Sequence, residues 1–378
     1  MAETKFIEPD LDFIARLKEN GGDSLKKCYQ CATCSVVCNV TPDPKPFPRK
    51  EMIWAQWGLK EKLMYNPDVW LCLNCGDCTD KCPRDARPSD VIGAIRNMSF
   101  KQLAVPTALG NALSKPSFLL PLFLLPIALL FIALLGYHGG LGIPEGEIVY
   151  SKLFPILLVD SIFVPVAFFI IITSALGIKK FWNGMKENYP PAGKLDIGGA
   201  IVETVIEILT HKKFADCNAN KSRRTAHLLL FFGFAALFIT TNAVLVYHYL
   251  FQIDTPLALS DPVKILGNIG AVIAFIGITL IFLNRVTGDK AAGNYSYYDK
   301  NFIFAVFFTV VTGIFSEIFR LADIAAVAYT VYFTHLVFVF FLLAYLPFSK
   351  FAHMLYRTTA LIYSKAAQRQ KIISKKGE

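Results

Sequence analysis

The sequence lacks the motifs by which most nucleotide-using and hydrolytic enzymes are known. It contains no G-x-G-x-x-G fingerprint after a strand, no Walker sequence and no pattern of a catalytic triad. Charged residues make up only 18% of the 378 residues, and there are only six histidines. These absences argue against two-electron flavin or substrate chemistry on this chain. No nucleic-acid-binding motif accompanies the formal net charge of +9, so we expect no nucleic-acid partner.

Cysteine, in contrast, is arranged in a clear pattern. Eight of the nine cysteines form two runs with the spacing C-x2-C-x2-C-x3-C, and Pro83 follows the second run. This spacing is typical of paired cubane clusters, in which three cysteines of one run bind one cluster and the fourth binds the other. The predicted ligands of the two [4Fe-4S] clusters are Cys28, Cys31, Cys34 and Cys82 for cluster one, and Cys72, Cys75, Cys78 and Cys38 for cluster two.

Zinc binding and a disulfide framework are the alternatives for these cysteines. Zinc sites usually show separated C-x2-C pairs that close one tetrahedron, and not an unbroken run of four cysteines that occurs twice. Cluster thiolates also require a reducing compartment, so we expect this part of the chain in the cytoplasm. The ninth cysteine, Cys217, stands alone in a later segment and is given no chemistry.

The rest of the chain is dominated by long apolar stretches. Each is close to the roughly 20 residues that a membrane-spanning helix needs, and a soluble core would not produce six in succession. The predicted fold is all-α, with a small ferredoxin-like helical head on a six-helix transmembrane bundle. Domain boundaries are expected at 1–100 (cluster domain), 101–116 (linker), 117–349 (transmembrane domain) and 350–378 (basic tail with His353). The spans are expected at 117–136, 153–178, 226–250, 262–284, 302–320 and 327–348.

Within the head, three helices are expected. An amphipathic helix covers 6–19, a short one runs from Arg49 to Trp57, and the last covers 89–100 with Ser89-Asp90 as its N-cap signal. The polar, mixed-charge start of the chain gives no sign of a cleavable signal peptide.

The distribution of Lys and Arg predicts the orientation in the membrane. The loops expected on one side carry nine, three and seven of these residues, and those on the other side carry one, none and none. Basic loops face the cytoplasm, so both termini and the clusters are expected there. The basic loops are 179–224, 285–301 and 350–378.

Four histidines mark the third and sixth spans. His227 and His353 are expected at the cytoplasmic level, and His248 and His335 near the outer ends, about 31 Å away on one helix and about 27 Å on the other. Imidazoles that face each other across a bundle are natural axial ligands of a b-type haem. The alternative is interfacial histidines that hydrogen-bond or reach towards headgroups. His211 is interpreted as a loop residue.

Two segments resemble the cytochrome b subunits of the nitrate reductase gamma family. They are Ile208 to Phe214, with Cys217 and Thr225-Ala226-His227 after it, and Pro347-Phe348-Ser349-Lys350-Phe351-Ala352-His353. The head resembles the iron–sulfur subunit of heterodisulfide reductases. A chain that joins both resembles the C subunits of the quinone-interacting membrane-bound oxidoreductase (Qmo) complexes of sulfate-reducing organisms.

The resemblance implies further cofactors and partners. It implies flavin- and iron–sulfur-containing cytoplasmic subunits, adenylylsulfate reductase as the downstream acceptor, and menaquinone in the membrane. It also implies that His227 and His353 bind haem b. Leu237 stands where the gamma family has a second histidine, so an outer haem would need His248 with His335. Two haems are predicted. The rival reading is one haem, with His335 left to bind a quinone.

Quinone chemistry needs titratable groups at membrane depth. Asp160, Asn242, Glu317 and His335 fall in the outer halves of their spans. We predict that Glu317 or Asp160 relays the proton, and the alternative is a structural pair of Glu317 with Arg320. The predicted function is electron transfer from menaquinol to cytoplasmic partners. The alternatives are the membrane subunit of a heterodisulfide-reductase-type complex with a different acceptor, and a redox-gated transporter or sensor.

Overall fold

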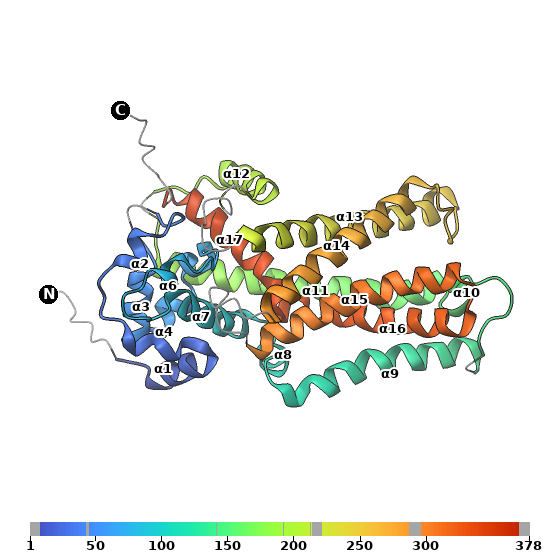
Figure 1. Cartoon of the computed structure of the whole chain (residues 1–378), viewed down its shortest axis with the longest axis horizontal. Coiled ribbons are helices and arrows are strands. Elements are labelled where there is room, and N and C mark those ends of the chain that lie inside the picture. Colours follow the sequence, from blue (N-terminus) through green and yellow to red (C-terminus); the bar gives the residue numbers. More distant parts are fainter. Residues whose placement is uncertain are drawn as a thin grey trace.

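The computed structural model describes residues 8–42, 45–140, 142–191, 193–211, 213, 221–286 and 296–369. In these ranges all regular elements are helices. Figure 1 shows a head of short helices at one end of the long axis and a bundle of long helices at the other. The all-α prediction with a head and a bundle is therefore confirmed. Cys217 and residues 6 and 7 of the first predicted helix lie outside the described residues.

Among the described residues, six helices are long and apolar enough to cross a membrane, as predicted. The second runs to Asn188, beyond the predicted end at 178, because an apolar stretch marks the width of a bilayer and not the end of a helix. The sixth ends at Ala344, earlier than predicted. The six are α9 (Leu119–His138), α11 (Ile156–Asn188), α13 (Lys221–Phe251), α14 (Pro262–Val286), α15 (Tyr297–Leu321) and α16 (Ala325–Ala344).

The head consists of helices of four to sixteen residues. The predicted cap of its last helix is wrong: Arg87 is the N-cap residue, while Asp90 forms an ion pair with Arg87 at 2.8 Å and the Ser89 hydroxyl bonds that of Thr79 at 2.6 Å. The helices are α1 (Leu11–Leu17), α2 (Thr33–Val36), α3 (Arg49–Gln56), α4 (Lys60–Met64), α5 (Pro67–Leu71), α6 (Asp77–Asp80) and α7 (Pro88–Leu103).

The expected linker and tail also contain helices. α8 (Thr107–Leu113) lies in the linker, and α17 (His353–Ala366) packs against α5, α11 and α12. Two further helices lie between the spans, α10 (Tyr150–Leu153) and α12 (Ile197–Thr210). One cluster of buried apolar side chains extends from Phe13 in the head to Phe341 and Tyr356. The head therefore shares its core with the bundle.

The third and fourth spans form a closely packed antiparallel pair. A Cβ atom on Gly233 would lie 2.6 Å from the backbone nitrogen of Ala274, and one on Gly277 would lie 2.5 Å from that of Leu230. Small residues let the backbones of membrane helices approach in this way. Leu230 is three residues from His227, so the pairing fixes the height of this histidine.

Replacing Gly277 by leucine is expected to separate α13 from α14. The new side chain would meet backbone atoms of Leu230 and Ala226, which cannot turn aside, so the cost should lie at the upper end of the roughly 1–3 kcal/mol typical of overpacked sites. Thermal unfolding of the detergent-purified protein measures this loss. Gly136→Leu on α9, where nothing lies within 4 Å, is the matched control. Equal melting temperatures for the two variants would contradict the packing argument.

Candidate functional site

The two cysteine runs fold in the same way. The residues on either side of the second cysteine have positive φ in both: Gln30 at +67° and Ala32 at +72° in the first run, Asn74 at +53° and Gly76 at +95° in the second. A short helix follows in each run and carries the third cysteine, Cys34 on α2 and Cys78 on α6. α2 and α6 contact each other. The sequence repeat is thus also a structural repeat.

Most thiols have their nearest charged neighbours within one predicted group, although Cys34 also acts on Cys78 of the other group. Burial raises the pKa of Cys34 to about 11, and the thiols that act on it are Cys28, Cys31 and Cys82. Burial raises the pKa of Cys38 to about 12, with Cys72 and Cys75 as its thiol neighbours. The fourth cysteine of each run therefore lies among the first three of the other run.

The surroundings of these thiols suit clusters. The backbone nitrogen of Asn74 donates to Sγ of Cys72 at 3.3 Å, and that of Ala86 donates to Sγ of Cys82 at 3.3 Å. Such bonds to ligand sulfurs tune cluster potentials. Among the described residues no three His, Cys, Asp or Glu side chains are grouped as one metal ion would require. Donor type, grouping and hydrogen bonds fit two cubane clusters.

His227 and His353, which we call the inner histidine pair, face each other. Their ring centroids are 6.5 Å apart and their planes are at 74°. A metal–imidazole nitrogen bond is about 2 Å long in zinc sites, so two imidazoles on opposite sides of one metal have centroids roughly 6 Å apart. The separation of the inner pair suits axial ligation of a haem iron.

The tautomer of His353 is fixed by a backbone carbonyl. Its Nδ1 lies 2.7 Å from the carbonyl oxygen of Lys350 and so carries the proton. Nε2 is then left with its lone pair, as a neutral imidazole ligand requires. Lys350 is itself held by an ion pair with Asp299 on α15.

His211 belongs to this site, which the sequence did not indicate. It caps the end of α12 with φ +48°, is only 9% exposed, and its ring centroid lies 5.5 Å from that of His227. Burial lowers its pKa. The interpretation of His211 as a loop residue missed this contact.

The outer histidines are not brought together. Nδ1 of His248 lies 2.8 Å from Oδ1 of Asp254, and Nδ1 of His335 lies 3.1 Å from Oγ1 of Thr312. The ring of His335 also fills the space beside Gly313, where a Cβ would lie 2.9 Å from it. No ring contact joins these two histidines, both of which the structure describes. Each outer histidine has a polar partner of its own, and a second haem between them stays a prediction.

The predicted proton-relay residues have other partners. Glu317 accepts from Arg320 at 2.8 Å and pairs with Lys264 of α14 at 2.8 Å, so the structural ion pair considered above is present and is extended by a second cation. The hydroxyl of Tyr249 donates to Asp160. Asn242 donates to the carbonyl oxygen of Phe238, one turn back on its own helix.

Arginines join the inner histidine pair to the cysteine loop of residues 72–78. Arg357, one turn after His353, donates to the carbonyl oxygens of Trp70 at 2.9 Å and Cys72 at 3.2 Å. Arg223, one turn before His227, donates to the carbonyl oxygen of Asn74 at 2.5 Å. Both histidine-bearing helices are thus bound directly to the loop that carries Cys72, Cys75 and Cys78.

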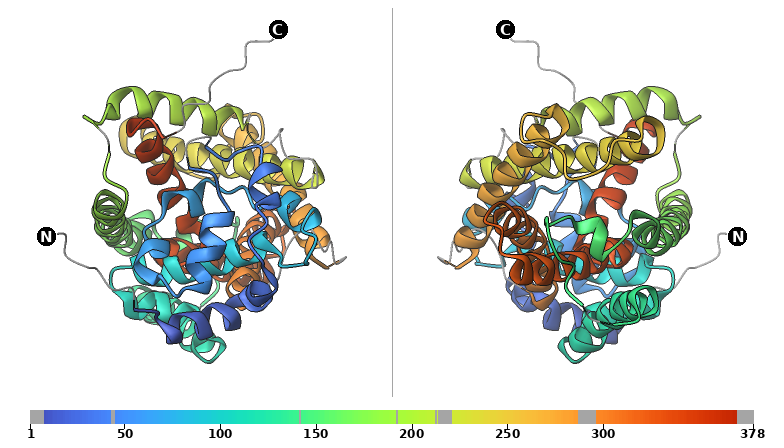
Figure 2. Two further views of the ribbon diagram at one scale, coloured as in Figure 1. Left: turned by 90° about the vertical axis from the view of Figure 1, so that its left-hand side faces the viewer. Right: turned by 90° about the vertical axis from the view of Figure 1, so that its right-hand side faces the viewer.

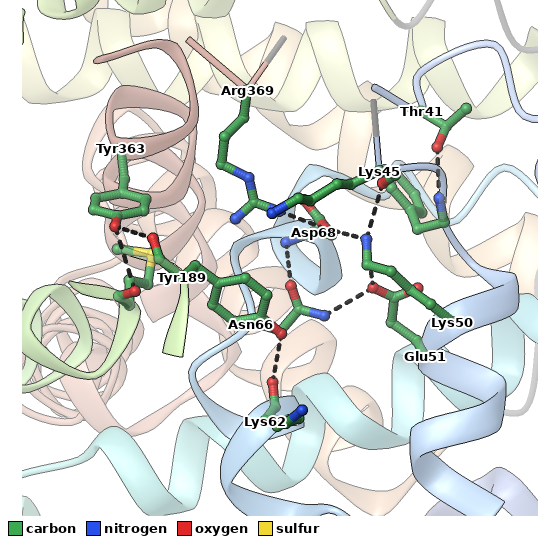
Figure 3. Close-up of polar contacts among 12 residues, drawn as sticks. Thr41, Lys45, Lys50, Glu51, Lys62, Asn66, Asp68, Tyr189, Tyr363 and Arg369 are labelled. Atoms are coloured by element: carbon green, nitrogen blue, oxygen red, sulfur yellow. Dashed lines mark hydrogen bonds and ion pairs between the residues drawn. The ribbon is translucent and has the colours of Figure 1, made fainter. Parts of the chain in front are cut away.

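A buried polar network holds the far end of α17 against the head (Figure 3). Asp68 is fully buried and pairs with Lys50 and with Arg369, the latter at 2.9 Å. The side-chain oxygen of Asn66 accepts from the backbone nitrogen of Asp68, and its amide donates to Glu51. Burial raises the pKa of Glu51, which Lys50 opposes. α5 starts at this network and Cys72 follows the end of α5, so the network fixes the position of Cys72.

Comparison with known proteins finds iron–sulfur relatives of the head. A family model described as a 4Fe-4S dicluster domain matches residues 24–86. The C subunit of the H(2):CoB-CoM heterodisulfide,ferredoxin reductase of Methanothermobacter marburgensis is 36% identical over 95 residues, which are 24% of this chain and 50% of that protein. A protein of Archaeoglobus profundus described as like the C subunit of heterodisulfide reductase is 30% identical over 106 residues, 28% of this chain and 56% of that protein. The chain spans about half the length of these relatives.

The membrane part matches a different family. The model for citrate utilization protein B matches residues 163–373, which include the inner histidine pair. The citrate utilization protein B of Escherichia coli is 27% identical over 315 residues, 77% of this chain and 80% of that protein. No solved structure matches the chain. The chain is a membrane protein whose iron–sulfur electron-transfer domain is like the C subunits of heterodisulfide reductases, and it belongs to the citrate utilization protein B family.

Proposed function

We propose that this chain conducts electrons between menaquinol in the membrane and cytoplasmic partner subunits, through one haem b and two [4Fe-4S] clusters. When bound, these groups supply one-electron chemistry. The observation that carries the proposal is the direct hydrogen bonding of both histidine-bearing helices, through Arg357 and Arg223, to the loop of Cys72, Cys75 and Cys78. In this proposal residues 1–100 form the cluster domain on the cytoplasmic side of the inner membrane, and 117–349 form the haem domain.

The residues of the site have separate tasks in this function. His353 keeps Nε2 available because its Nδ1–H donates to the carbonyl oxygen of Lys350, and the ring of His227 faces it, so these two side chains would hold the haem. Arg357 and Arg96 both donate to the carbonyl oxygen of Cys72 and place positive charge beside cluster two. Positive charge near a cluster favours its reduced form, so these arginines tune the cluster that lies nearest the haem site.

Asp160 and Glu317 are the candidates to move the quinol protons. Both lie in the outer halves of membrane-spanning helices, where carboxylates are costly and hence candidates for function. Glu317 is held between Lys264 and Arg320, and Asp160 accepts from Tyr249, so each has a polar neighbour with which a proton relay could continue.

Glu317→Gln is expected to slow quinol oxidation roughly 100-fold at normal haem content, because an amide cannot accept the proton. Turnover of menadiol by the membrane-embedded complex measures the effect. Lys264→Met removes one ion-pair partner and keeps the carboxylate, and we expect it to keep most of the activity. Unchanged turnover in Glu317→Gln, or an equal loss in Lys264→Met, would assign Glu317 a structural role only.

The partners in this proposal are flavin- and iron–sulfur-containing cytoplasmic subunits, with adenylylsulfate reductase as the final acceptor, as in Qmo complexes. A second candidate is the membrane subunit of a heterodisulfide-reductase-type complex with a different acceptor. This second candidate is favoured by the sequence of the head, which is 36% identical over 95 residues to a heterodisulfide reductase C subunit. Co-purification separates the two: adenylylsulfate reductase in the isolated complex supports the first.

A reduced-minus-oxidised difference spectrum of the purified chain tests the function itself. The proposal predicts a b-type haem band together with bleaching of the broad iron–sulfur absorption. One haem per chain, by pyridine haemochrome assay, is the expected count. Cluster bleaching without a haem band would overturn the proposal.

A further inference from the structure

Helix α12 has one face that packs inside the protein. Ala200 is 4% exposed, Thr204 is fully buried, and His211 at its end contacts His227. Glu207 pairs with Lys365 of α17 at 3.0 Å and with Lys213 at 3.1 Å. These residues recur at intervals of three or four, which places them on one side of the helix. This side attaches α12 to α17.

The opposite face of α12 is apolar and uncovered. With 100° per residue, its large side chains fall within one half of the helix circumference. Val202 is 60% exposed and Ile206 is 56% exposed. Exposure of such an apolar surface to water is unfavourable, so we expect lipid or another apolar surface to cover it. The exposed side chains are Ile197, Ile201, Val202, Val205, Ile206 and Leu209.

The position of α12 indicates what covers this face. The helix connects two membrane-spanning helices, α11 and α13, and lies where the head meets the bundle (Figure 1). Figure 2, which looks along the long axis, shows α12 lying across the view, while α11 is seen end-on. The helix thus lies across the direction of the spans, along the plane of a membrane that they would cross.

Neighbouring surfaces agree with a membrane. The spans before and after α12 also expose apolar side chains, such as Ile171, Ile172 and Phe232. Lys194 is exposed three residues before α12 begins, where it can reach an anionic headgroup. A helix with one apolar face and one polar face is typical of the membrane interface.

We propose that α12 is an interfacial helix whose apolar face, from Ile197 to Leu209, rests in the phospholipid leaflet next to the head. Contact with the leaflet would then stabilise α12 in the position in which the ring of His211 contacts that of His227. This proposal does not depend on haem, quinol or any electron-transfer role.

Photo-crosslinking of the full chain tests it. p-Benzoylphenylalanine is placed at Val202 or at Val205, with Glu203, exposed on the polar side of the same helix, as the matched control. The protein is reconstituted in nanodiscs of phosphatidylethanolamine and phosphatidylglycerol, irradiated and digested. Mass spectrometry of the peptide that contains the probe is expected to show phospholipid adducts at both 202 and 205, at least tenfold more abundant than at 203.

Other outcomes would overturn the proposal. A crosslink from either site to a second copy of the chain, or to another protein of the purified complex, would identify the face as a protein interface. Adduct levels equal to those at Glu203 would mean that the face is in water. A melting temperature equal to that of the wild type shows that each probe variant is folded, and this check is independent of the crosslinking result.

Discussion

Replacing His353 by alanine is expected to lower the haem content of the purified chain at least roughly tenfold. Loss of a residue that only hydrogen-bonds a metal ligand already lowers metal affinity roughly 10–100-fold, and loss of the ligand itself should cost more. The ring of His353 faces that of His227 at 6.5 Å, and its Nδ1–H bond to Lys350 leaves Nε2 for the metal. Alanine removes both the ligand and the fixed geometry. The pyridine haemochrome assay measures the loss.

The clusters serve as the internal control of this experiment. Their proposed ligands are all cysteines, so the electron paramagnetic resonance signals of both reduced clusters should persist in His353→Ala. His248→Ala is the matched histidine variant: His248 bonds Asp254 and contacts neither member of the inner pair, so its haem content should equal that of the wild type. Full haem in His353→Ala, or haem loss in His248→Ala, would contradict the assignment of the axial ligands.

Replacing Cys82 by serine is expected to remove cluster one, whose other ligands lie more than forty residues earlier in the chain. Cys82 acts on the thiols of Cys28 and Cys34, although it belongs to the second run. Iron per chain in the cluster domain should fall from about eight to about four, because each cubane holds four. Cys217→Ser, outside both runs, should keep all of it.

Double variants identify which cysteines share a cluster. Adding Cys31→Ser to Cys82→Ser should remove no further iron, because both residues belong to cluster one. Adding Cys75→Ser should remove the remaining four. If the run alone defined the cluster, the outcomes would be reversed: Cys82 with Cys75 would leave one cluster, and Cys82 with Cys31 would leave none.

The fold could be predicted from the sequence because its strongest signals are local. Apolar stretches mark the six spans, and the repeated cysteine spacing marks two loops that turn at Gln30 and Ala32 as at Asn74 and Gly76. These features depend on residues close together in the chain. The cap of α7 was predicted wrongly because Ser89 and Asp90 found other partners, Thr79 and Arg87.

The site was less accessible to prediction because it depends on which helices are neighbours. Counting residues along two antiparallel helices predicted that His248 and His335 lie at the same depth. In the structure α13 packs on α14 and α16 packs on α15. The depth of a residue does not reveal which helices are neighbours. His211 was missed because its contact with His227 requires the turn after α12. Arg357 offered a signal that could have been used: it lies one helical turn after His353 and so had to point towards the same side.

We propose that a haem held by His227 and His353 connects menaquinone with the clusters. The most direct test reduces the chain in liposomes with dithionite, mixes it with excess menaquinone dissolved in the same lipid, and follows cluster reoxidation by freeze-quench paramagnetic resonance. We predict that the clusters are reoxidised in the wild type and at least tenfold more slowly in His353→Ala. Equal rates in the two proteins would contradict the account.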